Sequence, residues 1–575
     1  MRRGVVLRSA WRLGRDYLFS KQKWTAWSLL LLVVCFNLLL VYITVQINLW
    51  QATFYNIIQS HNQAGFIEAI GFYALLAVIL VAVKGSQTYF RLLLHINWRQ
   101  WLTDKYLSYW LKNKIYYRLQ LYGGHDADNP DQRISEDVDL FVALTLRLSL
   151  ECMQDVLTVC SFIVILWNIS EVITISIGTI EFPIYGYLVW AALFYAMVGT
   201  YFTVRIGTPL IKLDYDQQKY EADFRYSLVR VREYAESIAL YGGESAERFN
   251  CLKHFQYLVY NFKEIIQIRK KLVWLTTGYA HAAVIFAIFV ASPRYFSGKI
   301  TLGHMFQIID AFNHVQSGMS FIIDSFTRVA QWRAVVNRLN NFIVCMEFAE
   351  KQGEKSVLQG RGSNNSNRSL ALQQVEVEKP DGQVLIKNLN FTLQAGNRLL
   401  ITGPSGCGKS TLIRTLAGLW IYAKGNVIAP QSEQSLFVPQ KPYMPIDTLR
   451  KALIYPYLNY TVSDKELVET LTLCRISYLA ARLEEVGDWG KFLSLGEQQR
   501  IAFVRILLQQ PAWLFLDEAT SALDDDNQTL MYSLVIKKMP NTVIVSVGHR
   551  KSIADYHNCK LVLDGAGGWT LHKGT

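Results

Sequence analysis

An uncharged apolar run near the N-terminus limits what this chain can fold into. Residues Trp24 to Val45 contain no charged side chain, and about 20 apolar residues in a helix cross the hydrocarbon core of a bilayer. A cleaved signal peptide is the alternative reading. The run is longer than a signal core, however, and it follows a long basic leader without a small-residue cleavage site behind it. The sequence therefore predicts a retained membrane helix.

Further apolar runs follow, and together with the first they make six candidate spans. They lie at about residues 66–83, 157–169, 185–204, 272–290 and 305–323. The composition agrees, because 51% of the 575 residues are hydrophobic and only 18% are charged. We therefore expect a helical membrane domain in contact with the lipid bilayer.

The distribution of basic residues predicts the orientation of these spans. A net charge of +12 raises the alternative that the chain binds nucleic acid. The basic residues instead gather before the first span and in residues 84–147 and 205–271, whereas residues 51–64 and 170–183 contain no Lys or Arg. Cytoplasmic loops carry such an excess. We therefore expect both termini in the cytoplasm and no nucleic-acid partner.

Four regions are predicted along the chain. Residues 1–23 form a cytoplasmic interfacial helix with an apolar face and a basic stripe, and residues 24–345 form the six-helix domain, with long helices reaching into the cytoplasm. Residues 346–369 are rich in Gly, Ser and Asn, which is typical of a linker. Residues 370–575 alternate β-rich runs with helical patterns, which predicts an α/β domain with a parallel sheet. The apolar face of the first helix comprises Leu7, Trp11 and Leu18, and its basic stripe Arg8, Arg12 and Arg15.

A glycine-rich segment in the last region fits a phosphate-binding loop. Its pattern is G-x-x-x-x-G-K-[ST], placed between a β-run and a helical run, so that backbone N–H groups and a helix N-terminus face the phosphates. We expect Lys409 to contact the β- and γ-phosphates of ATP, and Ser410 to bind Mg²⁺. The residues of the loop are Gly403, Pro404, Ser405, Gly406, Cys407, Gly408, Lys409, Ser410 and Thr411.

Two carboxylates end an apolar strand at residues 513–516. Adjacent strand residues point in opposite directions, so Asp517 and Glu518 can divide the chemistry: Asp517 for Mg²⁺ and Glu518 for the attacking water. The alternative is a pair of solvated acids. Charges that directly follow buried apolar residues nevertheless need a partner, which favours the functional reading.

Motifs around these residues resemble those of ABC transporter ATPases. Residues 493–500 (LSLGEQQR) are similar to the ABC signature, residues 521–524 (SALD) to the D-loop, Gln440 to the Q-loop glutamine and His549 to the switch histidine. The resemblance implies a six-helix, exporter-like (type IV) ABC fold joined to a P-loop NTPase domain.

The resemblance also implies roles and a partner. ATP would lie between the phosphate loop of one subunit and the signature of another, so that the chain pairs with a second copy of itself. Catalysis would involve Glu518 and His549, and Gln440 would join Ser410 and Asp517 at Mg²⁺ and contact nucleotide. The residues acting across the pair would be Ser494, Gly496 and Glu497 of the signature and Asp524 of the D-loop.

Departures from the commonest ABC sequence pattern indicate which branch of the family the chain resembles. Leu495 and Glu497 replace the usual signature residues, and no aromatic side chain stands near residues 378–382 to stack on adenine. With residues 129–138 (NPDQRISEDV) and 221–226 (EADFRY), these features resemble peroxisomal acyl-CoA half-transporters and bacterial SbmA/BacA-type proteins. The branch implies transport of a peptide, cobalamin or an acyl-CoA-like lipid across the bacterial inner membrane.

A polar stripe crosses the sixth candidate span. Gln307, Asp310, His314 and Ser317 recur at helical spacing, and such residues in lipid usually face an aqueous cavity. Asp310 and His314 are therefore candidates for the substrate path, with a simple pair inside the helix bundle as the alternative. Two other functions are considered. The first is a nucleotide-gated receptor or scaffold that does not pump, and the complete catalytic set favours ATP-driven transport over it. The second is a soluble ABC ATPase that remodels nucleic acid, which only the net basic charge favours.

Overall fold

The computed structural model describes residues 3–122, 129–170, 172–177, 180–355, 369–428, 434–457 and 461–573. The chain divides into two compact units. The helical unit comprises Met1–Tyr109 and His125–Val344, and the ATPase unit comprises Trp110–Gly124 and Cys345–Thr575. A short segment that precedes the third span in sequence thus packs with the C-terminal unit.

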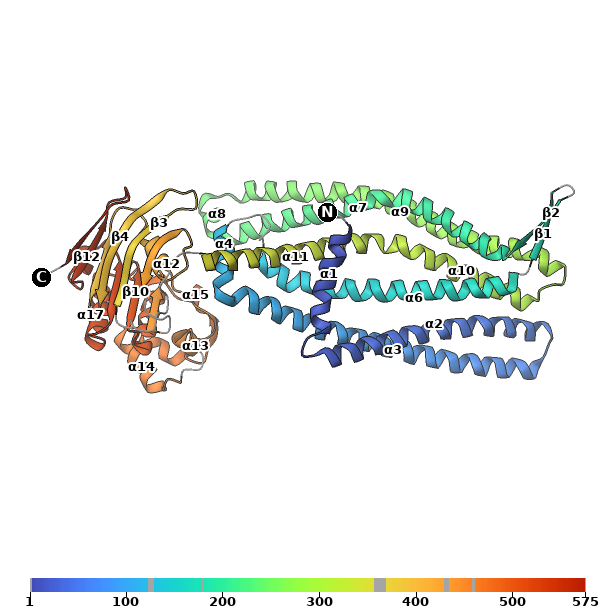
Figure 1. Cartoon of the computed structure of the whole chain (residues 1–575), viewed down its shortest axis with the longest axis horizontal. Helices are drawn as coiled ribbons and strands as arrows, with labels where there is room; N and C mark the ends of the chain where they lie inside the picture. The colour runs from blue at the N-terminus through green and yellow to red at the C-terminus, as the bar shows by residue number, and fades with distance from the viewer. Residues whose placement is uncertain are drawn as a thin grey trace. The chain divides into compact units, whose positions relative to one another are not determined.

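Long helices dominate the helical unit, in which α7 runs beside α9 and α10 contacts α2 and α6 (Figure 1). A β-hairpin, which the sequence did not predict, lies between α6 and α7. The elements of this unit are α1 (Arg3–Leu18), α2 (Lys23–Gln59), α3 (Gln63–Leu111), α5 (Pro130–Gln132), the π-helix η3 (Arg133–Asp137), α6 (Val138–Ser170), β1 (Val172–Ile177), β2 (Ile180–Tyr185), α7 (Tyr187–Glu233), α8 (Ala235–Tyr241), α9 (Glu244–Phe296), α10 (Leu302–Asp324) and the first part of α11 (Phe326–Lys355).

Five helices of the described residues are long and apolar enough to cross a membrane, and five of the six predicted spans lie in them. The sixth, residues 305–323, lies in α10 but is too polar to meet the same criterion. The reason lies in its packing, because α10 contacts α2, α6, α7 and α9. Its side chains Ala311, Phe312 and Val315 are completely buried. A helix enclosed by other helices needs less apolar surface than one that faces lipid.

Helix α1 packs on the helical unit through residues outside the apolar face that its sequence suggested for the membrane surface. Val6, Leu13 and Tyr17 are buried, and the ring of Tyr17 stacks on Trp98 of α3 with 5.6 Å between centroids. The predicted apolar residue Trp11 remains 63% exposed. The helix therefore has two apolar faces, one packed on the protein and one left for another surface.

The predicted linker begins later than its composition indicated. Helix α11 continues to Lys355, so residues 346–355 are helical, and residues 356–368 lie outside the described part of the chain. Tertiary packing stabilises this end of the helix. Lys112 Nζ lies 2.9 Å from Glu350 Oε1, and a Cβ at Gly353 would overlap the guanidinium of Arg118.

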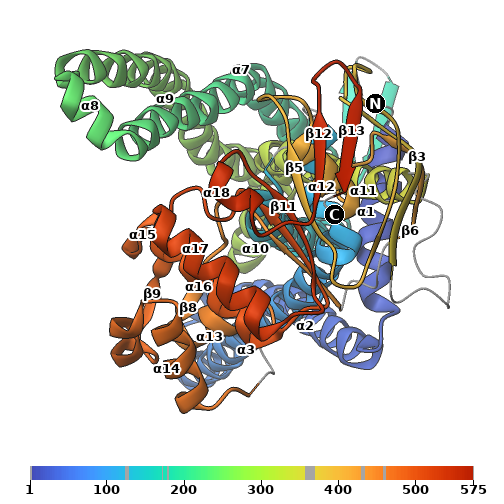
Figure 2. The same ribbon diagram turned by 90° about the vertical axis from the view of Figure 1, so that its left-hand side faces the viewer.

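The ATPase unit contains a six-stranded sheet in the order β13-β12-β5-β11-β10-β7, parallel except for β13. Its strands β13, β12, β5 and β11 can be followed in Figure 2. Smaller antiparallel sheets, β4-β3-β6 and β8-β9, accompany it. Its strands are β3 (Ser369–Glu378), β4 (Val384–Gln394), β5 (Arg398–Thr402), β6 (Ala423–Ile428), β7 (Ser435–Val438), β8 (Ile446–Thr448), β9 (Val486–Asp488), β10 (Trp513–Asp517), β11 (Val543–Val547), β12 (Cys559–Leu563) and β13 (Trp569–Lys573). Its helical segments, besides the end of α11, are η1 (Lys112–Lys114), α4 (Ile115–Tyr122), α12 (Lys409–Leu416), α13 (Leu449–Ile454), α14 (Asp464–Leu473), η5 (Ser477–Arg482), α15 (Trp489–Phe492), α16 (Leu495–Gln509), α17 (Asp525–Lys538) and α18 (Lys551–Ala554).

The β-run before the phosphate loop and the apolar strand at residues 513–516 are confirmed as β5 and β10, and each of them pairs in parallel with β11. All five residues of β11 and the first four of β10 are buried, as expected where helices cover both faces of a parallel sheet. Because parallel strands end at the same edge, the segments that follow β5, β7, β10 and β11 meet there.

A partly buried histidine anchors β11. His557 Nδ1 lies 2.8 Å from Ile553 O and its Nε2 lies 2.9 Å from Ser546 Oγ, which also accepts a hydrogen bond from Tyr532 at 3.1 Å. A neutral imidazole, with one donor and one acceptor, satisfies both contacts. Burial, with a smaller effect of the Arg398 charge, lowers the pKa of His557 to about 4.

We expect this histidine to make the ATPase unit sensitive to acid. Unfolded His557 binds a proton near pH 6.5 and folded His557 only near pH 4. Its contribution to stability is therefore complete above pH 6.5 and is lost as the pH falls toward 4. The expected loss is about 2 kcal/mol between pH 7 and 5, measured as the denaturation midpoint by tryptophan fluorescence.

The His557→Gln variant should show a flatter pH profile than the wild type. The exposed His572 on β13 provides the control, and His572→Gln should retain the wild-type slope. Equal slopes for His557→Gln and the wild type would contradict the assignment.

Candidate functional site

The glycine-rich segment between β5 and α12 forms a curled loop that faces its own lysine. Gly403, Gly406 and Gly408 have φ angles of 150°, 81° and 101°, which are accessible mainly to glycine. Lys409 is 7% exposed, and its Nζ donates to Gly403 O at 3.0 Å and to Pro404 O at 2.8 Å. The lysine is thus held over the loop, where a phosphate would bind.

The first helical serine and the end of β10 come together beside this loop. Ser410 Oγ donates to Asp517 Oδ1 at 2.8 Å. Burial raises the pKa of Asp517, the hydrogen bond from Ser410 opposes that shift, and the neighbouring Glu518 charge adds to it. A hydroxyl and a carboxylate at this spacing suit Mg²⁺, which takes one or two protein oxygens in addition to phosphate oxygens and water.

Glu518 is held between two loops. Its Oε2 accepts a hydrogen bond from Gln440 Nε2 at 3.1 Å, and its Oε1 lies 3.4 Å from His549 Nε2. Its φ angle is 49°, a left-handed conformation that is uncommon for a non-glycine residue and occurs where surrounding structure enforces it. The backbone therefore directs this carboxylate to one position, and side chains from the loops after β7 and β11 hold it there.

Arg550 joins the site without having been predicted. Its Nη1 donates to Leu523 O at 2.7 Å and its Nη2 to Ser521 O at 3.2 Å, so the residue after His549 holds the backbone of the segment 521–524. The available sequence signal was its position beside the histidine. That signal does not reveal which carbonyl groups it binds.

Comparisons with known proteins match both units. Residues 15–296 match the family "ABC transporter transmembrane region 2", and residues 386–521 match the family "ABC transporter". An ABC transporter ATP-binding protein of Haemophilus influenzae is 34% identical over 98% of this chain and 93% of its own length. The chain belongs to the ABC transporter family.

Other relatives place this ABC transporter among bacterial and D-family members. The inner membrane ABC transporter ATP-binding protein YddA of Escherichia coli is 32% identical over 94% of each chain, and the human lysosomal cobalamin transporter ABCD4 is 27% identical over 94% of this chain and 92% of its own. A bacterial Atm1-family exporter with ATP bound shares the fold, with a TM-score of 0.70 and 18% identity over 94% of each chain.

These findings confirm the predicted exporter-like fold and the ATPase activity coupled to transport. With one transmembrane region and one ATPase domain, the chain is an ABC half-transporter. Its nucleotide-binding domain is built for ATP.

The signature residues of this ABC transporter form a helix cap. Ser494 Oγ accepts from Glu497 N at 3.3 Å and donates to the Glu497 carboxylate at 2.8 Å, and that carboxylate also accepts from Ser494 N. Tyr478 OH donates to Glu497 as well, a contact that the sequence did not suggest. Gly496 lies close to the D-loop, because a Cβ there would be 3.1 Å from Ala522 O.

The predicted D-loop residue Asp524 also caps a helix. Its side chain accepts from Asn527 N at 2.7 Å at the start of α17. The structure brings Lys409, Ser410, Asp517 and Glu518 into one cluster with Gln440 and His549. The signature residues and Asp524 make their hydrogen bonds within their own helix starts or with Tyr478.

The polar stripe of α10 contacts neighbouring helices. Asn48 of α2 is completely buried and donates to Asp310 Oδ2 at 2.7 Å. His314 Nε2 lies 3.7 Å from Asp310 Oδ2, and its ring stacks on Phe162 with 4.2 Å between centroids. Both side chains nevertheless remain about one-third exposed, at 29% and 31%.

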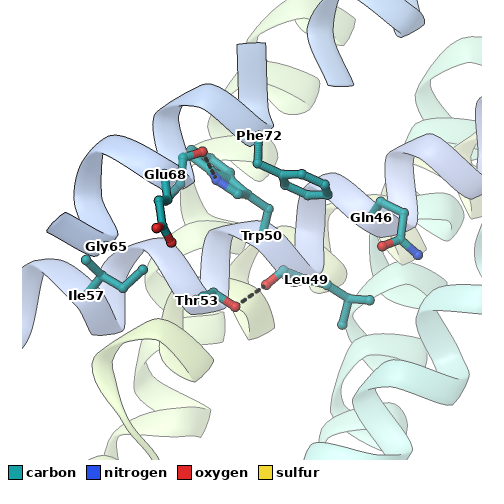
Figure 3. A pocket seen from close by; sticks show the side chains of 9 residues that line it. Gln46, Leu49, Trp50, Thr53, Ile57, Gly65, Glu68 and Phe72 are labelled. Carbon is teal, nitrogen blue, oxygen red and sulfur yellow. Dashed lines mark hydrogen bonds between the residues drawn. The ribbon is translucent and has the colours of Figure 1, made fainter. Parts of the chain in front are cut away.

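A separate cavity of about 390 Å³ lies between α2 and α3 (Figure 3). Trp50 and Phe72 line it, and Trp50 Nε1 donates to Ala69 O at 2.7 Å across the two helices. Glu68 adds a carboxylate to the lining. Neither Asp310 nor His314 belongs to this cavity.

Gly403→Ala should disable nucleotide binding. A Cβ at this position would lie 2.5 Å from Leu563 O and 2.9 Å from Cys407 Sγ, so the loop and the carbonyl group that binds Lys409 must shift. We expect the affinity for ATP to fall at least about tenfold, which corresponds to 1.4 kcal/mol, as measured by titration of the purified protein with a fluorescent ATP analogue.

The control for this variant is Gly396→Ala. Gly396 has a similar positive φ of 80° and no atom near its added Cβ, and it lies in the turn between β4 and β5. This substitution should cost stability without changing the affinity for ATP. An unchanged affinity in Gly403→Ala would show that the loop tolerates the shift.

Proposed function

We propose that this half-transporter hydrolyses ATP as a homodimer to move a peptide, cobalamin or an acyl-CoA-like lipid across the bacterial inner membrane, with both termini cytoplasmic. The observation that carries the proposal is the Glu518 carboxylate, held by Gln440 at 3.1 Å and by His549 at 3.4 Å. A carboxylate fixed from two sides beside a phosphate loop suits the orientation of an attacking water.

The other site residues take roles that fit their positions. Lys409 would contact the β- and γ-phosphates, and His549 would lie near the γ-phosphate. Mg²⁺ would be held by Ser410 and Asp517, with Gln440 beside them, and when bound it neutralises charge that develops on the phosphate oxygens. The glycines of residues 403–408 keep the loop open for backbone N–H groups to bind phosphate.

A second copy of the chain would complete the site. The resemblance to ABC ATPases assigns Ser494, Gly496 and Glu497 to ATP bound on the partner copy. Their location at the N-terminus of α16 supports this assignment, because a helix start attracts phosphate groups. A chain with one ATPase domain then needs a second one, and Asp524 would lie near the contact between the two.

The substrate class rests on relatives. The similar human protein is named a lysosomal cobalamin transporter, and the similar Escherichia coli protein is named an inner membrane transporter. The motifs at residues 129–138 and 221–226 resemble those of SbmA/BacA-type proteins, whose members move peptide antibiotics or cobalamin. These likenesses support the inner membrane and a peptide or cobalamin ahead of other cargo.

Glu518→Gln should abolish turnover while keeping nucleotide binding. The amide preserves the shape of the side chain and can still accept from Gln440, but it cannot take a proton from water. We expect ATPase activity to fall at least about 100-fold, and ATP to trap a dimer detectable by size-exclusion chromatography with light scattering. Glu469→Gln on the exposed surface of α14 is the control and should remain active.

Two outcomes would refute this proposal. Full ATPase activity in Glu518→Gln would remove the assigned role of the carboxylate. A wild-type chain that stays monomeric while hydrolysing ATP at full speed would remove the composite site.

Asp310 supports a polar substrate path through the helical unit. One of its oxygens accepts from Asn48, while 29% of its side chain remains accessible. A carboxylate inside a membrane domain usually serves an ion or substrate pathway. We propose that Asp310 faces a cationic part of the cargo and that His314, stacked on Phe162, lines the same path.

The Asp310→Asn variant removes the negative charge of the side chain and keeps its size, so it tests whether the charge itself is needed for transport. Asparagine can still accept the hydrogen bond from Asn48, so the melting temperature should change little. Uptake of a cationic peptide into vesicles of known sidedness should fall at least about tenfold, whereas uptake of cobalamin should persist. Lys409→Ala provides the background without ATP-driven transport, and Asn48→Ala should lower the melting temperature. Unchanged peptide transport in Asp310→Asn would restrict Asp310 to a structural role.

A further inference from the structure

A buried glutamine on the signature helix connects two loops of the nucleotide site. Gln499 is completely buried. Its Nε2 donates to the backbone oxygen of Gln440 at 3.0 Å and to Ser521 Oγ at 3.3 Å, and its Oε1 accepts from Ala522 N at 3.0 Å. One side chain therefore binds the Q-loop on one side and the D-loop on the other.

The segments that it joins are themselves at the surface. Gln440, Ser521 and Ala522 are all exposed, and each belongs to a loop that follows a strand of the parallel sheet, β7 for Gln440 and β10 for the other two. The α16 helix that carries Gln499 starts at the signature. The side-chain amide of Gln499 thus joins the Q-loop, the D-loop and the helix that starts at the signature.

Only a side chain with both a donor and an acceptor fits this position. The carbonyl oxygen of Gln440 needs a donor, and the N–H of Ala522 needs an acceptor. Because the amide is buried, a loop that moved away alone would leave a polar group without a partner, which is costly. The Q-loop and D-loop are therefore constrained to move together.

We propose that Gln499 is a positioning residue that transmits displacement of the Q-loop to the D-loop. Gln440 connects the same device to catalysis, because its backbone is bound by Gln499 while its side chain binds Glu518. A displacement of the Q-loop thereby shifts the position of the Glu518 carboxylate and the position of the dimer-facing D-loop together. This inference rests on the proposed homodimeric ATPase.

The test compares Gln499→Met and Gln499→Glu in the full-length protein reconstituted in lipid. Methionine removes donor and acceptor at similar volume. Glutamate keeps an acceptor for Ala522 N–H but loses the donor to Gln440 O. We expect kcat for ATP hydrolysis to fall at least about tenfold in both, with KM for ATP within about twofold of the wild type, because Gln499 contacts neither Lys409 nor Ser410.

The matched control is Gln509→Met on the same helix. Gln509 Nε2 donates to Tyr455 O at 3.0 Å, so its loss also removes an amide-to-carbonyl bond from α16, but at a distance from the nucleotide site. Its kcat should stay within about twofold of the wild type. The KM and the fraction of protein that binds nucleotide report whether each variant is folded.

The outcomes distinguish this inference from the proposed function. Full kcat in Gln499→Glu or Gln499→Met, with Glu518→Gln inactive, would overturn the role of Gln499 alone. A loss of kcat accompanied by an equal loss of nucleotide-binding fraction, or the same loss in Gln509→Met, would make its role merely structural and would also overturn the inference. Retained activity in Glu518→Gln would instead refute the proposed function.

Discussion

The position of the Glu518 carboxylate, which accepts a hydrogen bond from Gln440 and lies 3.4 Å from His549 Nε2, is the constraint on which the nucleotide site depends. Gln440 and His549 bind it from two different loops, and those loops follow β7 and β11, which flank β10 in the sheet. Strand order and parallel direction therefore bring the three side chains to one edge. The backbone at Glu518 has a left-handed conformation that a free chain avoids. The surrounding structure must therefore stabilise this conformation as well as the side-chain contacts.

The helical unit is organised by a related constraint, since polar groups buried among apolar helices need partners. Asn37 is completely buried, donates to Leu150 O at 3.2 Å and accepts from Gln87 at 3.2 Å. Asn48 makes the corresponding link between α2 and α10. Such bonds fix how the helices are rotated against one another, which apolar contacts alone leave open.

Some features could be predicted from the sequence because their signals are local. The phosphate loop is a run of consecutive residues whose glycines and lysine act together, and the acids at 517 and 518 end one short strand. The contacts of Gln499, Arg550 and Tyr478 could not be predicted, because each partner lies far along the chain. The same applies to α11, in which packing against Arg118 and Lys112 extends a helix through residues whose composition is typical of a linker.

The sequence by itself determined the membrane character of the chain, the ATPase motifs and the strands that carry them, since hydropathy and short-range spacing suffice for these features. Tertiary structure alone decided which face of α1 is buried, why α10 can be polar, and how one glutamine joins two loops. These depend on which elements become neighbours, and a side chain's partner is set by that proximity rather than by its place in the chain.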